Sequence, residues 1–351
     1  MKKLLDRIFI DGLGGMAQGL FATLIIGTII QQIGLFMGGG TGDLIYELGK
    51  IAAGLTGAGI GVGVARKLEA GHLVIVSAAV VGMIGAFAGK ILSGQVLVDG
   101  NLVLAGPGEP LGAFAAAYLA IEIGILISGK TKLDIILTPL VCIGTGSAVG
   151  LFVGPPISEF MLWLGAFFHW GTEQQPFLMG IVVSVLMGMI LTLPISSAAL
   201  GVILNLSGLA AGAATIGCCC NMIGFAVASW RENKFSGFLA QGIGTSMLQI
   251  PNIVRRPLIW LPVILSSAVL GPIGTMLLHM TNNATGSGMG TAGLVGPLMT
   301  WQVMTQSEAG VIVLGKIILI QFILPAAVTL LISEFMRKKK WIRQGDMKLE
   351  L

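Results

Sequence analysis

Long apolar stretches alternate with short polar or Gly/Pro-rich segments along almost the whole chain. Most of these stretches reach the length of about 20 residues that an α-helix needs to cross the hydrocarbon core of a bilayer. The pattern predicts transmembrane helices near 13–34, 44–65, 72–92, 111–128, 133–153, 177–195, 198–229, 257–280 and 310–333. Two shorter apolar pieces, 157–170 and 236–253, are either crossings or re-entrant segments. A re-entrant segment must be surrounded by protein or line a water-filled cavity.

Basic residues in the connecting segments indicate which ends of the spans face the cytoplasm. They include Arg66/Lys67, Lys130/Lys132, Arg255/Arg256 and the run Arg337–Lys340. If these positions are cytoplasmic, both termini lie inside and the number of spans is even. Counting 157–170 as a crossing and 236–253 as re-entrant gives about ten spans. The expected fold class is an all-α polytopic membrane protein with Gly/Pro-broken and re-entrant segments.

Composition supports a membrane protein and narrows the function classes. The 351 residues are 55% hydrophobic and only 10% charged, whereas soluble domains carry about 25% charged residues. The net charge of +4 comes mainly from the chain ends and short loops, so it reports topology and does not suggest nucleic-acid binding. The sequence shows no metal-ligand spacing, no Walker loop and no nucleophile–base pattern. We therefore expect no metal, no cofactor and no autonomous enzyme.

Glycine is the second compositional signal. The chain holds 53 glycines, roughly twice the usual share of about 7%, and many recur at spacings that let membrane helices approach closely. Segment 209–229 also resembles segment 50–65, and 256–274 resembles 132–157. We expect a single membrane domain over 1–351, with repeat halves at 1–170 and 176–336 and a basic cytoplasmic tail at 337–351.

The stretch GPGEPLG at 106–112 places one carboxylate, Glu109, between two prolines and beside Gly108. The prolines restrict the backbone and the glycines expose amide groups. A carboxylate held in this way could accept hydrogen bonds from the hydroxyls of a sugar or polyol. Alternatively, Glu109 caps the helix expected from Leu111 onward, where the helix dipole favours a negative charge.

A second candidate is the uncharged polar stretch at 281–297. Its hydrogen-bonding side chains are Asn282, Asn283, Thr285 and Ser287. Such a stretch is typical of a re-entrant hairpin that lines a cavity, or of an ordinary extracellular loop. Asn205 and Asn221 flank a Gly-rich break and are further candidates to line a pathway.

Glu122 lies in the middle of the span expected at 111–128. An ionisable group there costs about 2.5–3.5 kcal/mol on insertion scales, so it should face the protein interior or a cavity. It is either a hydrogen-bonded structural carboxyl or a proton-coupling or substrate-contacting group. Glu109 and Glu122 would lie roughly 20 Å apart along one helix, so they cannot jointly hold one small ligand unless that helix breaks.

Three stretches resemble a known family. GPGEPLGAF at 106–114 is similar to the G-x-x-E-P substrate motif of the sugar-transporting EIIC components of the bacterial phosphotransferase system. The opening LLDRIFIDGLGGMAQGLFATLIIGTIIQQIG and the stretch TPLVCIGTGSAVGLFVGPPIS resemble the wider EIIC-like group, which includes membrane regulators of perfringolysin type. The motif falls in the first half of this chain, whereas in the well-known sugar EIICs it falls late.

The resemblance implies a dimeric protein of the bacterial inner membrane with a sugar-like site between repeats. It carries over to Glu109 the role of accepting hydrogen bonds from sugar hydroxyls. We expect no fused EIIB or EIIA domain, so phosphorylation of the cargo would need separate soluble partners. The leading hypothesis is a permease for a small neutral solute, which the resemblance identifies as a sugar. The alternatives are a membrane sensor that binds a ligand without transport and a proton-coupled carrier that uses Glu122.

Overall fold

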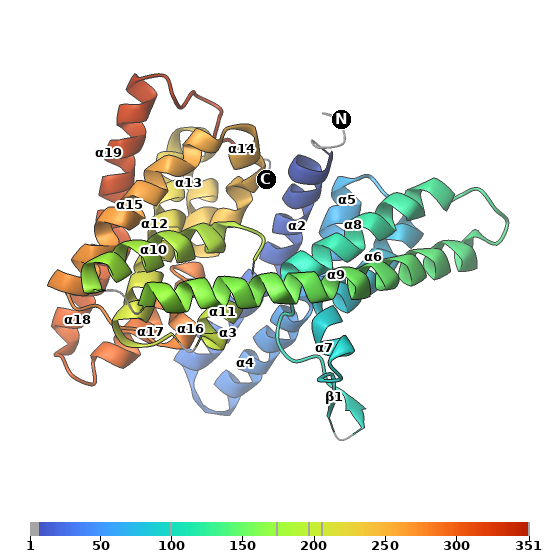
Figure 1. The fold of residues 1–351 in the computed structure, drawn as a ribbon, viewed down its shortest axis with the longest axis horizontal. Helices are drawn as coiled ribbons and strands as arrows, with labels where there is room; N and C mark the ends of the chain where they lie inside the picture. Colours follow the sequence, from blue (N-terminus) through green and yellow to red (C-terminus); the bar gives the residue numbers. More distant parts are fainter. Residues whose placement is uncertain (1–6, 99, 173–174, 196, 205, 350–351) are drawn as a thin grey trace. The chain divides into compact units, whose positions relative to one another are not determined.

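The computed structural model describes residues 7–98, 100–172, 175–195, 197–204 and 206–349. Within these ranges the chain is helical apart from loops and one hairpin, β1 (Leu97–Val98) paired with β2 (Asn101–Leu102) (Figure 1). Six helical runs are long and apolar enough to cross a membrane: Arg7–Met37, Pro110–Ile127, Asp134–Ile157, Gly208–Ala228, Pro257–Leu277 and Gly310–Lys338. The helical membrane class is confirmed, and the count of about ten spans stays a prediction.

Several expected spans have different boundaries. Residues 44–65 form two helices, α4 (Gly39–Gly54) and α5 (Thr56–Lys67), which are bent by 50° and count as a seventh crossing only if taken together. The break expected between 153 and 157 is wrong, because α9 runs from Asp134 to Thr172 through Pro155 and Pro156. A proline inside a helix cannot donate to the carbonyl four residues earlier and its ring crowds that carbonyl. Membrane helices tolerate this where neighbouring groups satisfy the freed carbonyl.

Contacts divide the chain into unit 1 (Met1–Leu162) and unit 2 (Trp163–Leu351). Unit 1 begins with one long helical run. It consists of the π-helical turn η1 (Arg7–Gly12), α2 (Leu13–Leu20), the π-helical turn η2 (Phe21–Ile25) and α3 (Ile26–Met37); the label η denotes π- or 3₁₀-helical segments. After α4 and α5 come α6 (His72–Ala86), α7 (Ala88–Leu92), the hairpin and α8 (Pro110–Ile127), and α9 starts in this unit.

Glycines set the helix spacing in unit 1. A Cβ on Gly15 of α2 would lie 2.5 Å from the carbonyl oxygen of Gly63 in α5, and a Cβ on Gly57 of α5 would lie 2.6 Å from that of Gly82 in α6. A Cβ on Gly61 would overlap the backbone carbonyl of Ala78. Alternate glycines of α5 therefore bring its backbone against α2 on one side and α6 on the other, as the glycine spacing predicted.

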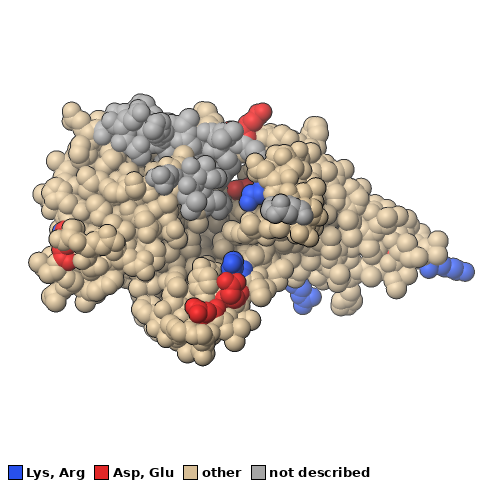
Figure 2. Space-filling view, turned by 90° about the horizontal axis from the view of Figure 1, so that it is seen from below, with Lys and Arg blue, Asp and Glu red and all other residues tan. Residues whose placement is uncertain are grey.

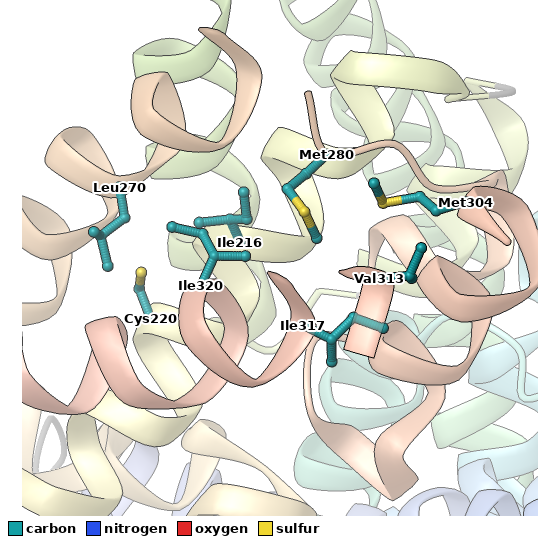
Figure 3. Close-up of a cluster of buried hydrophobic side chains, with 8 residues drawn as sticks. All are labelled: Ile216, Cys220, Leu270, Met280, Met304, Val313, Ile317 and Ile320. Carbon is teal, nitrogen blue, oxygen red and sulfur yellow. The ribbon is translucent and has the colours of Figure 1, made fainter. Parts of the chain in front are cut away.

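Unit 2 is built around α12 (Gly208–Ala228), which packs against α10 (Pro176–Thr192), α15 (Leu261–Pro272) and α19 (Leu324–Lys338). Of an 18-residue apolar stretch of α12, 89% is buried inside the protein. Its cysteines Cys218, Cys219 and Cys220 are free thiols. Figure 3 shows Ile216 and Cys220 of α12 among side chains from α15 and from the helices after residue 304. The many glycines, alanines and cysteines of α12 allow three neighbouring helices to approach it.

Short elements connect these helices. They are α11 (Ser197–Ile203), α13 (Trp230–Leu239), η3 (Ala240–Gly244), η4 (Ser246–Gln249), α14 (Ile250–Arg255), η5 (Pro257–Trp260), η6 (Ile273–Leu277), α16 (Ala284–Ser287), η7 (Ala292–Leu294), α17 (Val295–Met304), α18 (Gly310–Ile317) and η8 (Ile318–Ile323). Segment 236–253 thus consists of short π, 3₁₀ and α turns with no helix long enough to span a bilayer.

Large apolar side chains cover much of the outer surface. Val311, Phe152 and Ile135 are 86%, 83% and 73% exposed, and Figure 2 shows few charged residues on the face it displays. Exposed aliphatic rows on helices are expected where the surrounding solvent is lipid, because the helices satisfy their own backbone groups.

Glycine packing in unit 1 yields a matched pair of substitutions. We expect Gly61→Ala to lower the free energy of unfolding by about 1–3 kcal/mol, because the new methyl group meets backbone that cannot rotate away. Gly54→Ala, whose Cβ meets nothing within 4 Å, should leave stability unchanged or slightly higher. Thermal or denaturant unfolding of the purified protein in detergent compares the two, and equal effects would contradict this packing.

Candidate functional site

Glu109 occupies the end of the loop that joins the hairpin to α8. The backbone N–H of Glu109 donates to the carbonyl of Ala86 at 2.8 Å. Gly108 has φ +71° and lies so close to Ala86 that a Cβ would come within 2.6 Å of the Ala86 methyl group. Only glycine accommodates both the positive φ and this close approach. The loop is therefore fixed against the end of α6 immediately before the carboxylate.

The half-buried Glu109 side chain is the N-cap of α8. Its Oε1 accepts from the backbone N–H of Leu111 at 3.5 Å, and Pro110 occupies the first turn of the helix. The positive end of the helix dipole stabilises an ionised carboxylate at this position. Since a carboxylate has about four acceptor positions, capping α8 and accepting a ligand hydroxyl are chemically compatible.

Glu122 lies further along α8 and pairs with Arg7 at the start of the first helical run. Arg7 Nε is 2.6 Å from Glu122 Oε1, and both side chains are partly buried, at 39% and 31% exposed. Arg7 Nη2 also donates to Glu122 Oε2 at 3.4 Å. The sequence placed Glu122 toward the protein interior but missed its partner, because Arg7 is 115 positions away. The ion pair joins α8 to the start of the first helical run.

Asn282 is a buried hydrogen-bonding centre of unit 2. Its side-chain Nδ2 lies 2.8, 3.1 and 3.0 Å from Thr215 Oγ1, Gly296 O and Thr300 Oγ1. Its Oδ1 accepts from the backbone N–H of Asn283 at 2.8 Å. Both polar ends of the amide are thus used within the protein, and they join α12, α17 and the start of the 281–297 stretch.

The neighbouring candidates differ in exposure. Asn283 caps α16, accepting from Gly286 N at 2.9 Å. Ser287 is fully buried and donates to Ala284 O at 2.8 Å, whereas Thr285 is exposed. Residues 286–293 are all buried, so this part of the stretch is an irregular segment enclosed by protein and not an open loop.

Asn221 lies at the centre of another polar cluster in unit 2. Its Oδ1 accepts from Thr192 Oγ1 and from Trp260 Nε1, both at 3.2 Å, and its Nδ2 donates to Gly217 O at 3.1 Å. The side chain is fully buried. It connects α10, α12 and η5. Asn205, the companion candidate, lies outside the described residues.

A chain of buried amides connects segment 236–253 to the end of the protein, which the sequence did not predict. Gln249 Nε2 donates to Gln241 Oε1 at 2.8 Å and to the backbone oxygen of Met347 at 3.0 Å. Asn252 Nδ2 donates to Gln249 Oε1 at 2.8 Å and to Lys348 O at 2.9 Å. The polar side chains of this apolar segment were the available signal, and their partners are backbone groups of the chain's own tail.

A pocket of about 760 Å³ opens in unit 1 beside Arg7. It is lined by Arg7, Asp11 and residues 66–70, which form the end of α5 and the turn after it. These residues offer both donors and acceptors to a polar ligand, whereas Glu109 is not among them.

The role of Asn282 can be tested directly. We expect Asn282→Ala to lower the free energy of unfolding by at least about 2 kcal/mol, because buried donors and acceptors on several elements lose their partner. Thr285→Ala, an exposed change in the same stretch, should alter it by less than about 0.5 kcal/mol. Unfolding of both variants in detergent provides the comparison, and a mild effect at Asn282 would refute the structural role.

The Arg7–Glu122 pair can be tested by a double-mutant cycle with Arg7→Gln and Glu122→Gln. We expect a coupling free energy of about 1 kcal/mol, because the pair is close and partly buried. The reference is the pair Lys50–Glu47, which is more exposed and 3.4 Å apart and should couple by about 0.3–0.5 kcal/mol. No excess coupling between Arg7 and Glu122 would contradict the geometry.

Comparison with known proteins supplies the family. The family model described as "Phosphotransferase system, EIIC" matches residues 10–349. A search of curated proteins finds no match. The matched region includes the Glu109 loop, both polar centres of unit 2 and nearly all of the described helices. The chain therefore belongs to the EIIC family of the phosphotransferase system, whose members are membrane components of sugar transport.

Proposed function

We propose that this protein binds a neutral sugar and carries it across the bacterial inner membrane as a permease with both termini in the cytoplasm. Separate soluble subunits would phosphorylate the sugar, and the protein would act as a homodimer. The observation that carries the proposal is the position of Glu109, a carboxylate fixed by its backbone at the start of α8, in a chain whose family transports sugars.

The chemistry of Glu109 suits a ligand rich in hydroxyl groups. An ionised carboxylate accepts hydrogen bonds that are roughly twice as strong as those between neutral partners. The hydrogen bond from the Glu109 N–H to Ala86 O holds the backbone in place, so the loop itself loses little conformational freedom when a ligand binds. In this proposal Glu109 accepts two sugar hydroxyls, and the packing of Gly108 against Ala86 sets the path of the loop that presents it.

The other candidate residues take supporting roles in the proposal. Asn283 is partly buried and Thr285 is exposed. Compared with the buried Asn282 and Ser287, their polar groups are the more accessible to a solute. Asn282, Ser287 and Asn221 use their hydrogen bonds within unit 2 and would shape the irregular backbone. Because Glu122 pairs with Arg7, we assign Glu122 to holding α8 against the start of the first helical run.

The proposal predicts a specific effect of Glu109→Gln. The amide oxygen can still cap α8, so unfolding without ligand should change little. Loss of the charged acceptor should weaken sugar binding about tenfold to a hundredfold. The measurement is the rise in unfolding temperature of the purified protein with a panel of neutral sugars, polyols and small acids. Glu47→Gln, which alters an exposed carboxylate in the same unit, is the control and should retain the wild-type response.

The outcomes separate the functions. A sugar that stabilises the wild type and Glu47→Gln but not Glu109→Gln would support the proposed site, and uptake of that sugar into proteoliposomes would then establish transport. Binding without uptake, even with the soluble phosphotransferase subunits present, would instead indicate a sensor. Equal stabilisation of Glu109→Gln would contradict the proposed contact and leave Glu109 as a helix cap.

A further inference from the structure

The last membrane helix ends in a dense group of cations. The run Gly310–Lys338 has 29 residues, which at about 1.5 Å each makes roughly 43 Å. This exceeds the hydrocarbon thickness of about 30 Å, and because charged residues belong at the interface, we infer that the end of α19 extends into the headgroup region. Lys338, Lys339, Lys340 and Arg343 follow one another at this end, and all are exposed.

The chain beyond α19 is folded back and held in place. Residues 341–349, here called the C-terminal strap, bury Ile342, Met347 and Leu349 to 2%, 0% and 8% exposure. Ile342 and Met347 pack in one apolar cluster with side chains of α12, α14, η5 and α15. Asn233 binds the strap at two points, donating to Met347 O and accepting from Leu349 N, both at 2.8 Å.

The carboxylates that line this end of unit 2 already have partners. Glu232 is bound by the nearly buried guanidinium of Arg337 at 3.1 Å. Glu334 pairs with Arg231 at 3.0 Å, and Asp346 lies 3.8 Å from Arg256. In the described part of the chain, no carboxylate pairs with Lys338, Lys339, Lys340 or Arg343. The exposed cations therefore form an excess of positive charge on a fixed backbone.

Two aromatic rings border these cations. Phe335 and Trp341 are 55% and 52% exposed and pack edge to face at 6.4 Å. The Lys339 ammonium lies 5.9 Å from the centre of the Phe335 ring. Exposed aromatic rings at the end of a membrane helix are typical of the bilayer interface, where the ring contacts lipid and its edge contacts water.

We propose that Phe335, Lys338–Lys340, Trp341 and Arg343 form a binding surface for the headgroups of anionic phospholipids. Cations near an anionic leaflet each contribute about 1 kcal/mol of attraction. Lys338–Lys340 lie at the packed end of α19 and Arg343 lies in the strap, so binding orders few additional residues. A lipid surface fits better than an acidic protein, because the patch continues an apolar membrane helix and presents aromatic rings among its cations. The surface lies in unit 2 and is independent of the sugar site proposed above.

The test uses the full-length protein in nanodiscs of phosphatidylcholine and in otherwise identical nanodiscs that contain phosphatidylglycerol. We expect the anionic lipid to raise the unfolding temperature of the wild type. The double variant Lys338→Gln/Lys339→Gln should lose most of this rise while unfolding normally in phosphatidylcholine. The matched control is Lys130→Gln/Lys132→Gln, which also removes two exposed cations from a connecting segment and should keep the rise.

Three results would overturn the proposal. One is no response of the wild type to anionic lipid. Another is an equal loss in both double variants, which would indicate a general effect of charge. The third is a rise of the same size when inorganic phosphate is added to phosphatidylcholine nanodiscs, since the ligand would then be a free anion and not a lipid surface.

Discussion

In a lipid environment apolar side chains gain little by leaving their solvent, so helices associate through close backbone contact and buried hydrogen bonds. Both units of this protein depend on that constraint. In unit 1 the glycines of α5 admit the backbones of α2 and α6 on either side. In unit 2 the small residues of α12 allow α10, α15 and α19 to surround it. A chain with ordinary glycine content could not place these helices so close together.

The same constraint explains the buried amides. Irregular backbone is tolerated at membrane depth only where protein or enclosed water satisfies its polar groups. Asn282 supports the enclosed stretch after η6, Asn221 joins three elements at the centre of unit 2, and Gln249 binds the returning tail. These side chains hold broken segments in defined positions, and the rearrangement of such segments is what solute movement would require.

Several charged side chains of the described residues are paired within one unit. Arg7 pairs with Glu122 and Arg337 pairs with Glu232. Glu109 caps the N-terminus of α8, and its backbone N–H donates to Ala86 O. Lys338, Lys339, Lys340 and Arg343 at the end of α19 and just beyond it have no carboxylate partner among the described residues.

Local patterns in the sequence determined the helical membrane class, the close approach of glycines, the start of α8 beside Glu109 and the inward position of Glu122. Hydropathy, glycine spacing and turn residues act over a few positions, so one sequence suffices to read them. The continuity of α9 through Pro155 and Pro156, the pairing of Arg7 with Glu122 and the return of the C-terminal strap were decided by the tertiary structure. Partners such as Arg7 and Glu122 are 115 residues apart, and only packing of the folded chain determines which distant groups satisfy a buried charge or amide.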